Sequence, residues 1–228
     1  MSINVKNLWV LNVAGFEIWI TETIFNTWLI MAFLIALAVM ARIQLRNFKE
    51  VPTGLQNIIE AVVEIFDNFA RSNLGEKLSY IAPWYFMVFV FVFSCNLFSI
   101  FGVRAPTADW ATTFALAFAT FVLMNYLGLK YRKGDYLKSF FEPHLIFFPM
   151  NLIGELAKPV SLSFRLFGNI LSGTIILTLY YALTPLFVQF GIPALLHGFF
   201  DVIFGSLQTY IFVIISLMFV RVAADDSW

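Results

Sequence analysis

The sequence predicts an all-α integral membrane protein, because of its composition and its long apolar stretches. Hydrophobic residues make up 61% of the 228 residues and charged residues only 12%, and the mean hydropathy is +0.84. Soluble domains carry about 25% charged residues, so a water-soluble protein of this size would lack the polar groups needed to cover its surface. The composition excludes a cytosolic enzyme, a nucleic-acid-binding protein and a disordered chain.

Five apolar stretches reach the length of a membrane crossing, which takes about 20 residues for a hydrocarbon core of roughly 30 Å. In chain order, the predicted crossings are residues 24–41, 81–103, 110–129, 145–189 and 192–221. The second and third form a helical hairpin. The last two are divided by Pro185 and Pro193, and each is too long for one perpendicular crossing. We expect them to form a long, strongly tilted helical hairpin within a single membrane domain over residues 1–228.

Residues 54–72 predict a different kind of helix, because their apolar residues recur at helical spacing on one side only. These residues are Leu55, Ile58, Ile59, Val62, Ile65, Phe66 and Phe69. The acidic residues Glu60, Glu64 and Asp67 fall on the opposite side. The pattern is typical of an amphipathic helix that lies in the membrane surface. The alternative is an ordinary loop helix that faces solvent.

The distribution of Lys and Arg predicts the direction in which the chain crosses the membrane. One set of connecting segments carries ten of them: Arg42, Arg46, Lys49, Arg71, Lys77, Lys130, Arg132, Lys133, Lys138 and Arg221. The opposite side carries only Lys6 and Arg104, which predicts an N-terminus outside and a C-terminus in the cytoplasm. Residues 8–16 form a short apolar run, but Asn12 interrupts it, so we do not expect a cleaved signal peptide.

The chain lacks the residue patterns that metal or nucleotide chemistry needs. Cys95 is its only cysteine, and His144 and His197 are its only histidines, so we expect neither a disulfide framework nor a metal centre. No GxxxxGK[ST] loop occurs in the sequence, so we expect no nucleotide site and no cofactor. Equal numbers of acidic and basic residues give no overall attraction for a polyanion.

Three ionisable residues stand inside the apolar sequence of residues 151–169: Glu155, Lys158 and Arg165. Each such residue costs about 2.5–3.5 kcal/mol on insertion scales, which makes it a functional candidate. Arg165 stays protonated under essentially all conditions, so it can attract a carboxylate but cannot relay a proton. The alternative is an interfacial anchor that reaches back toward Lys158.

Small and polar residues share the helical face of Arg165. They are Ser161, Gly168, Asn169, Ser172 and Gly173. Such residues let another helix approach closely, which in membranes usually means ordinary helix packing. Around a buried Arg, they suggest that the approaching helix carries an acid.

A second polar stripe lies on the predicted last helix, where His197, Asp201, Gly205 and Gln208 recur at intervals of four, four and three. Asp201 in an apolar segment either pairs with a cation such as Arg165 or faces water. With His197 and Gln208 beside it, Asp201 could pass protons along a hydrated path. The alternative is a carboxylate that caps a loop or serves only stability.

The run KPVSLSFRLFGN at residues 158–169 resembles the signature of subunit a of F-type ATP synthases. Three further stretches agree with this family in order and spacing: RAPTADWATTFALA at residues 104–117, FFEP at residues 140–143, and the last helix with Gln208. The resemblance covers roughly residues 20–222.

The resemblance implies a stator, not an enzyme by itself, that holds a curved helical hairpin against a rotating ring of c subunits. Two offset half-channels, one from each side of the membrane, would lead to the carboxylates of the ring and couple ion flow to ATP synthesis elsewhere in the complex. The family also implies peripheral-stalk b subunits as partners and the bacterial cell (inner) membrane as the location. The residues alone leave a self-contained ion channel or secondary transporter as the alternative, and they do not decide between H⁺ and Na⁺.

Carried over residue by residue, the resemblance makes Arg165 the essential arginine that prevents ions from passing directly between the half-channels. Asn169 matches a polar residue one turn later, and Gln208 matches a glutamine that faces the arginine. Asp201 stands where relatives often carry His or Glu in the outer half-channel. Thr174 is a departure, because many relatives have an acid there, so the ionisable role falls on Asp201. Weaker candidates for the ion path are Thr174, His197, Glu155, Lys158, Asn96 and Ser99.

Overall fold

Five long apolar helical stretches dominate the computed structural model, which describes residues 7–13, 16–44, 54–100, 103–184 and 191–225. Within these residues, the stretches long and apolar enough to cross a membrane are Glu22–Gln44, Glu76–Ile100, Trp110–Arg132, Leu145–Leu183 and Leu195–Ala224. The prediction of an all-α membrane protein with about five crossings is confirmed.

The individual helices follow the apolar pattern of the sequence. The long ones are α1 (Glu22–Gln44), α2 (Leu55–Leu74), α3 (Ala82–Ile100), α4 (Trp110–Arg132), α6 (Phe148–Leu183) and α8 (Gly205–Ala224). Short helical segments join them: η2 (Glu76–Ile81), η3 (Pro106–Ala108), α5 (Gly134–Ser139), η4 (Leu145–Phe147), α7 (Ile192–His197) and the π-helical η5 (Gly198–Phe204).

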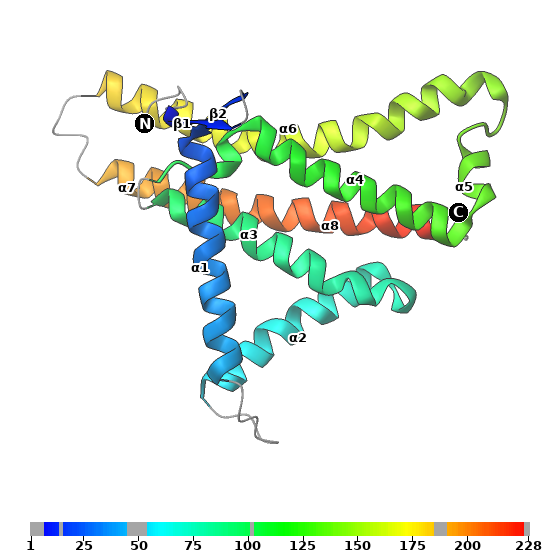
Figure 1. The fold of residues 1–228 in the computed structure, drawn as a ribbon, viewed down its shortest axis with the longest axis horizontal. Coiled ribbons are helices and arrows are strands. Elements are labelled where there is room, and N and C mark those ends of the chain that lie inside the picture. The colour runs from blue at the N-terminus through cyan, green and yellow to red at the C-terminus, as the bar shows by residue number, and fades with distance from the viewer. Residues whose placement is uncertain (1–6, 14–15, 45–53, 101–102, 185–190, 226–228) are drawn as a thin grey trace.

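Helix α8 lies at the centre of the arrangement and contacts α2, α3, α4 and α6. Helices α3, α4, α6 and α8 run alongside one another, whereas α1 crosses them steeply near one end (Figure 1). The largest fully buried side chains include Tyr85 of α3, Leu166 of α6, and Phe212 and Leu217 of α8. The core therefore lies between α8 and its neighbours, and α1 packs at the periphery.

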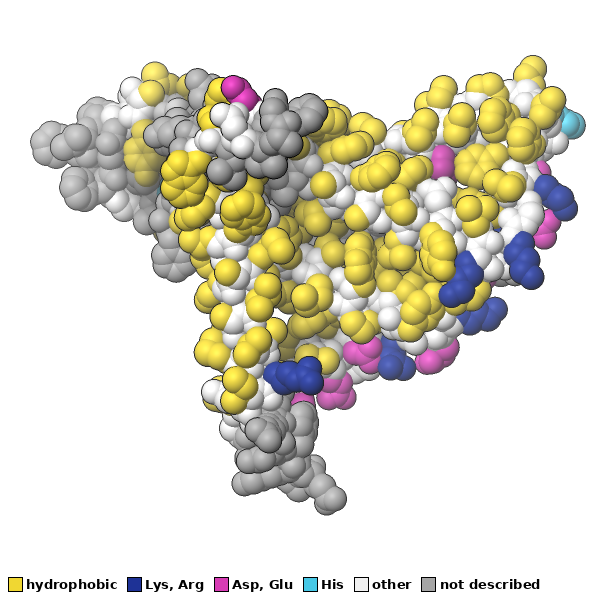
Figure 2. All heavy atoms as spheres, viewed as in Figure 1, with side chains coloured by type: hydrophobic (Ala, Val, Ile, Leu, Met, Phe, Trp, Pro, Cys, Tyr) yellow, Lys and Arg dark blue, Asp and Glu magenta, His cyan; other side chains and the backbone are white. Residues whose placement is uncertain are grey.

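Apolar side chains cover most of the visible surface, and the charged side chains gather along one edge, around the ends of α2 and α5 (Figure 2). In water such a surface would be unfavourable, whereas lipid tails solvate it well. The charged edge is the one where the counts of Lys and Arg predict the cytoplasm.

Helix α2 has the amphipathic pattern that the sequence predicts, but only part of its apolar side is covered. Phe66 and Leu74 are buried against the core, whereas Ile58, Val62 and Ile65 are exposed. The acidic side is held by bonds within the helix, such as the ion pair of 2.6 Å between Arg71 Nε and Asp67 Oδ2. Its location in the membrane surface stays a prediction.

A short β-hairpin, which was not predicted from the sequence, precedes α1. Strand β1 (Asn7–Val13) pairs antiparallel with β2 (Phe16–Thr21), with Val10 opposite Trp19 and Asn12 opposite Glu17. Aromatic and β-branched residues of this kind fit a pleated surface well. The run at residues 8–16, considered above as a possible signal sequence, thus belongs mostly to the hairpin.

Helix α6 ends at Leu183 and not at residue 189 as predicted. Thr184 is extended, with φ −100° and ψ 140°, because a residue that precedes a proline is driven out of the helical region. The rest of the predicted segment, residues 185–189, lies outside the described residues. Helix α3 is described as far as Ile100, residues 101–102 of the predicted crossing lie outside the described residues, and Val103 is not helical.

The RAPTAD motif connects α1 to the turn between α3 and α4. Arg104 forms an ion pair of 2.8 Å with Asp109, and Asp109 also accepts a hydrogen bond from the Thr23 hydroxyl. Asn26 Nδ2 donates to the Arg104 carbonyl oxygen at 3.0 Å. These bonds hold the first turns of α1 at the same level as the start of α4.

Candidate functional site

Asp201 lies in the π-helical segment η5, directly after α7. Its Oδ2 atom is 2.8 Å from His197 Nδ1, one turn earlier in the chain. The sequence left open whether Asp201 pairs with Arg165 or faces water. In the structure, its ionisable partner is His197 on its own helix. Short π-helical stretches inside α-helices are frequent at functional sites.

Asn96 joins α3 to the beginning of α8 through a pair of buried hydrogen bonds. Its Nδ2 atom donates to the Gly205 carbonyl oxygen at 3.0 Å and to Thr209 Oγ1 at 3.1 Å. A Cβ atom on Gly205 would lie 3.0 Å from the Cβ of Asn96, so any other residue here would force Asn96 to shift. Asn96, a weaker candidate for the ion path from the sequence, thus serves helix packing. Thr209 was missed, although it stands beside Gln208.

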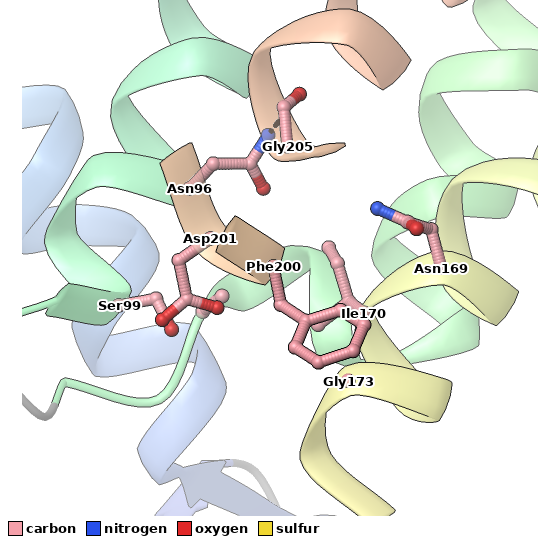
Figure 3. A pocket seen from close by; sticks show the side chains of 9 residues that line it. Asn96, Ser99, Asn169, Ile170, Gly173, Phe200, Asp201 and Gly205 are labelled. Carbon is pink, nitrogen blue, oxygen red and sulfur yellow. Dashed lines mark hydrogen bonds between the residues drawn. The ribbon is translucent and has the colours of Figure 1, made fainter. Parts of the chain in front are cut away.

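Four of the sequence-predicted residues meet around a small cavity of about 10 Å³: Asn96, Ser99, Asn169 and Asp201. Figure 3 shows the carboxylate of Asp201 pointing toward Ser99, with Phe200 between Asp201 and α6. A polar cavity of this volume has room for about one water molecule. The structure therefore brings polar groups of α3, α6 and η5 to one hydratable position.

Phe200 and Gly173 form the contact that positions η5 against α6. A Cβ atom on Gly173 would lie 3.4 Å from the Phe200 Cβ, which is ordinary van der Waals contact. Neither Phe200 nor Ala105, which also lines the cavity, was singled out from the sequence. Both are common apolar residues with no chemical signal of their own.

Arg165 lies on the exposed side of α6 and, among the described residues, has no ion pair or hydrogen bond. Ser172 is exposed on the same helix, and its hydroxyl donates only to the Asn169 carbonyl oxygen, at 2.9 Å. A Cβ atom on Gly168 would meet nothing within 4 Å. The opposite side of α6 is buried at Ser163 and Leu166. Among the described residues, the part of this face at Arg165, Gly168 and Ser172 is thus left open, whereas Asn169 and Gly173 lie against η5.

Neither Gln208 nor Thr174 is among the residues that line the Asp201 cavity. The Gln208 side chain is buried, and its Nε2 atom has no hydrogen-bond partner among the described residues. Thr174 Oγ1 donates to the Ile170 carbonyl oxygen on its own helix at 2.9 Å. No hydrogen bond connects Gln208 with Arg165 in the part of the chain that the structure describes.

Glu155 and Lys158 form an ion pair of 2.7 Å on α6, away from the cavity. The ammonium group of Lys158 also lies 5.5 Å from the ring centre of Phe219 on α8. The second carboxylate oxygen of Glu155 is buried and has no hydrogen-bond partner among the described residues. These residues make a second polar site that faces the C-terminal end of α8.

The described residues contain no group of three or more His, Cys, Asp or Glu side chains that could hold a metal ion. Arg165 is a fixed cation on an open face of α6. The polar site of Asp201 lies toward one end of this helix, and the pair of Glu155 and Lys158 lies toward the other. Residues 24–221 match the family described as the ATP synthase A chain. This chain belongs to the ATP synthase A chain family. The resemblance stated from the sequence is thereby confirmed.

Several relatives in this family match over most of their length. The ATP synthase subunit a of Moorella thermoacetica is 33% identical over 203 residues, which cover 88% of this chain and 89% of that protein. An ATP synthase subunit a 2 of a Picosynechococcus species is 35% identical, covering 90% and 86%. The sodium ion specific ATP synthase subunit a of Propionigenium modestum is 31% identical, covering 94% and 77%. As a subunit a, the chain is a non-catalytic, multi-pass membrane component of an ATP synthase.

Proposed function

We propose that this subunit a is the ion-translocating stator of its ATP synthase and presents the open face of α6 to a ring of c subunits. Ion flow, carried by H⁺ or Na⁺, passes through two offset half-channels and turns the ring. The observation that carries this proposal is Arg165, a permanent cation on an apolar helix with no partner among the described residues.

An unpaired arginine at this place needs a partner outside the described chain. A charged side chain within the membrane is costly unless it finds an opposite charge or water, and Arg165 cannot release its proton to become neutral. A carboxylate on a ring helix supplies the opposite charge. The small residues near Arg165, such as Gly168 and Ser172, leave room for that helix to approach.

The half-channels correspond to the two polar sites on either side of Arg165. Toward the N-terminal end of α1 lie Asp201, His197 and the hydratable cavity beside Asn169. Toward the other end of α6 lies the pair of Glu155 and Lys158. At about 1.5 Å per residue, Glu155 precedes Arg165 by roughly 15 Å of helix. Arg165 lies between the two sites, where a fixed positive charge repels cations.

The membrane potential drives the ion from one polar site to the other by way of the ring. Moving one charge across the membrane yields about 2.3 kcal/mol per 100 mV. Arg165 favours the ionised form of a passing ring carboxylate, which promotes release of the ion on one side. A neutral side chain at this position would let ions pass between the half-channels without rotation.

The experiment is Arg165→Ala in the purified ATP synthase, reconstituted in vesicles with an imposed ion gradient. We expect the complex to assemble and ATP synthesis to fall to background, because the barrier between the half-channels is lost. Lys138→Gln, which removes an exposed cation at the charged edge, is the matched control and should synthesise ATP normally. Coupled synthesis at near-normal rate in Arg165→Ala would disprove the stator role.

The same vesicles distinguish the coupling ion and the alternative function. An imposed proton gradient and an imposed sodium gradient are compared in turn, and the one that supports synthesis identifies the ion. A self-contained channel would conduct ions as the purified chain alone, whereas the stator requires the ring. Flux through the isolated chain that Arg165→Ala abolishes would favour the channel.

The contact with the ring and the orientation in the membrane are tested by cysteine chemistry in a Cys95→Ala background. Ser172→Cys should cross-link to a c subunit, whereas Ile58→Cys on α2 should not. Cysteines near the N-terminus should react with impermeant reagents from outside, and cysteines near Arg221 from the cytoplasm. Peripheral-stalk b subunits are expected to cross-link away from the Arg165 face.

A further inference from the structure

A cavity lies far from the ion path, at the charged edge of the molecule. Its volume is about 220 Å³, compared with about 10 Å³ for the cavity beside Asp201. It opens between the turn from α2 to η2, the end of α4 and the end of α8. Three apolar spans begin or end here, at Glu76, Arg132 and Ala224. The cavity therefore lies at the level where the hydrocarbon core meets the lipid headgroups.

The charges around this cavity are mixed and balanced. Lys77 and Arg221 supply two cations, and Glu76 and Asp225 supply two carboxylates. The guanidinium of Arg221 donates through one nitrogen to the Asn73 carbonyl oxygen at 3.2 Å, which fixes it at the end of α2. Glu76 makes only a loose contact with Arg71, at 4.0 Å. A ligand that carries both signs of charge matches this set better than a simple anion does.

The inner part of the cavity is apolar and aromatic. Leu78 is buried beneath it, and the ring of Tyr131 forms part of its wall. Lys130 lies 5.7 Å from the ring centre of Tyr131 and 5.6 Å from that of Tyr80, so a further cation borders the tyrosines. Gly75, with φ +77°, makes the sharp turn between α2 and η2 that leaves the cavity open.

We propose that this cavity binds the headgroup of a phosphatidylethanolamine lipid. The phosphate accepts hydrogen bonds from Lys77 and Arg221, and the ammonium group donates to Glu76 and Asp225. The glycerol end rests on Leu78 and Tyr131, and the acyl chains continue into the apolar layer. A lipid that lacks the amine, such as phosphatidylglycerol, is disfavoured, because it brings no cation to the two carboxylates. The bound headgroup joins the α2 turn to the C-terminal end of α8, which no covalent loop connects.

The test measures lipid that stays bound to the purified ATP synthase complex, by native mass spectrometry after equilibration in vesicles of phosphatidylethanolamine and phosphatidylglycerol. Lys77→Gln should reduce the phosphatidylethanolamine bound to subunit a about fivefold, since one basic group near a membrane surface contributes about 1 kcal/mol. Lys138→Gln, an equal change of charge on the same edge, should have no effect.

A second variant distinguishes the zwitterionic lipid from other occupants. Glu76→Gln should reduce binding of phosphatidylethanolamine and increase binding of phosphatidylglycerol, because it removes a group that attracts the amine and repels the anion. Equal phosphatidylethanolamine binding in Lys77→Gln and Lys138→Gln would overturn the proposal. So would a Lys77→Cys variant that cross-links in high yield to another subunit, because the cavity would then hold protein.

Discussion

Two glycines in the C-terminal hairpin, one on α8 and one on α6, have very different surroundings. Gly205 at the start of α8 has Asn96 so close that an added Cβ would lie 3.0 Å from it, whereas Gly168 on α6 has nothing within 4 Å. Each follows a phenylalanine in the chain, and the local sequence alone does not distinguish their roles. In the structure, Gly205 belongs to the fold of this chain. Gly168 lies on a face of α6 that the described residues leave open, and we propose that another subunit covers it.

Asn96, Gly205 and Thr209 hold α3 against α8, whereas we propose that the open face of α6 contacts a partner. Around Gly205, the polar groups of Asn96 and Thr209 satisfy one another. Around Gly168, the charge of Arg165 has no partner among the described residues. Substitutions at the first place should therefore affect folding, and substitutions at the second should affect only coupling.

The largest effect on folding is expected for Gly205→Val, because the added methyl groups overlap Asn96 and force α3 away from α8. Overpacking of this kind costs about 3 kcal/mol. Cys95 is fully buried beside Asn96, so the temperature at which it reacts with a thiol-specific dye reports the opening of α3. Gly154→Val is the control, because Gly154 has open space around it. Equal melting of the two variants would contradict the packing role.

Gly168→Val should leave that melting temperature unchanged but lower gradient-driven ATP synthesis about tenfold. The valine side chain would lie on the open face and meet only the approaching ring helix. An overpacking cost of about 1.4 kcal/mol there corresponds to a tenfold lower rate. Gly154→Val again serves as control and should synthesise normally. Normal synthesis by Gly168→Val would place the ring elsewhere.

Asp201→Asn should slow proton-driven synthesis by up to about tenfold, less than a general acid–base group usually contributes, because water in the adjoining cavity takes over part of the transfer. The amide keeps the size of the side chain, so assembly should be normal. Adding Thr174→Glu should restore part of the rate, since it returns a carboxylate to the facing helix. An unchanged rate and pH profile would show that Asp201 is not the relay.

The smallest effect is expected for Ser163→Ala, on the buried side of α6. The Ser163 hydroxyl lies 3.3 Å from Thr113 Oγ1, but the Thr113 hydroxyl also donates to the Trp110 carbonyl oxygen. Thr113 therefore keeps a partner, and the stability should fall by less than about 1 kcal/mol. Ser172→Ala, on the exposed side, should not change it at all. A loss of several kcal/mol for Ser163→Ala would mean that this bond is central to the fold.

The sequence was sufficient for the crossings, because lipid imposes a strong requirement for long apolar segments. It was also sufficient to single out Arg165 and Asp201, since charges in such segments are costly. It was insufficient for the contacts between helices. The pairing of Asn96 with Thr209 depends on how α3 and α8 pack, and nothing in the local pattern of either helix specifies it.

The sequence also did not predict the local backbone geometry. Helical spacing predicts His197, Asp201, Gly205 and Gln208 as one stripe, but that spacing presumes a regular α-helix throughout. The structure contains the π-helical η5 in the middle. Gln208 is buried and is not among the residues that line the Asp201 cavity. The β-hairpin before α1 was not predicted, because a helical period in the sequence gives no sign of a strand.

The π-helical turn also affects how this chain should be compared with its relatives. A π-helix bonds each residue to the one five positions away, where an α-helix uses four, so the segment accommodates an additional residue while the helix continues. A relative without this turn would need one residue fewer in this segment to bring the flanking side chains to the same places. The counterpart of Asp201 in such a relative is therefore found by superposition in space. An alignment that counts back from Gln208 without a gap in residues 198–204 would pair Asp201 with a residue one position away from its true counterpart.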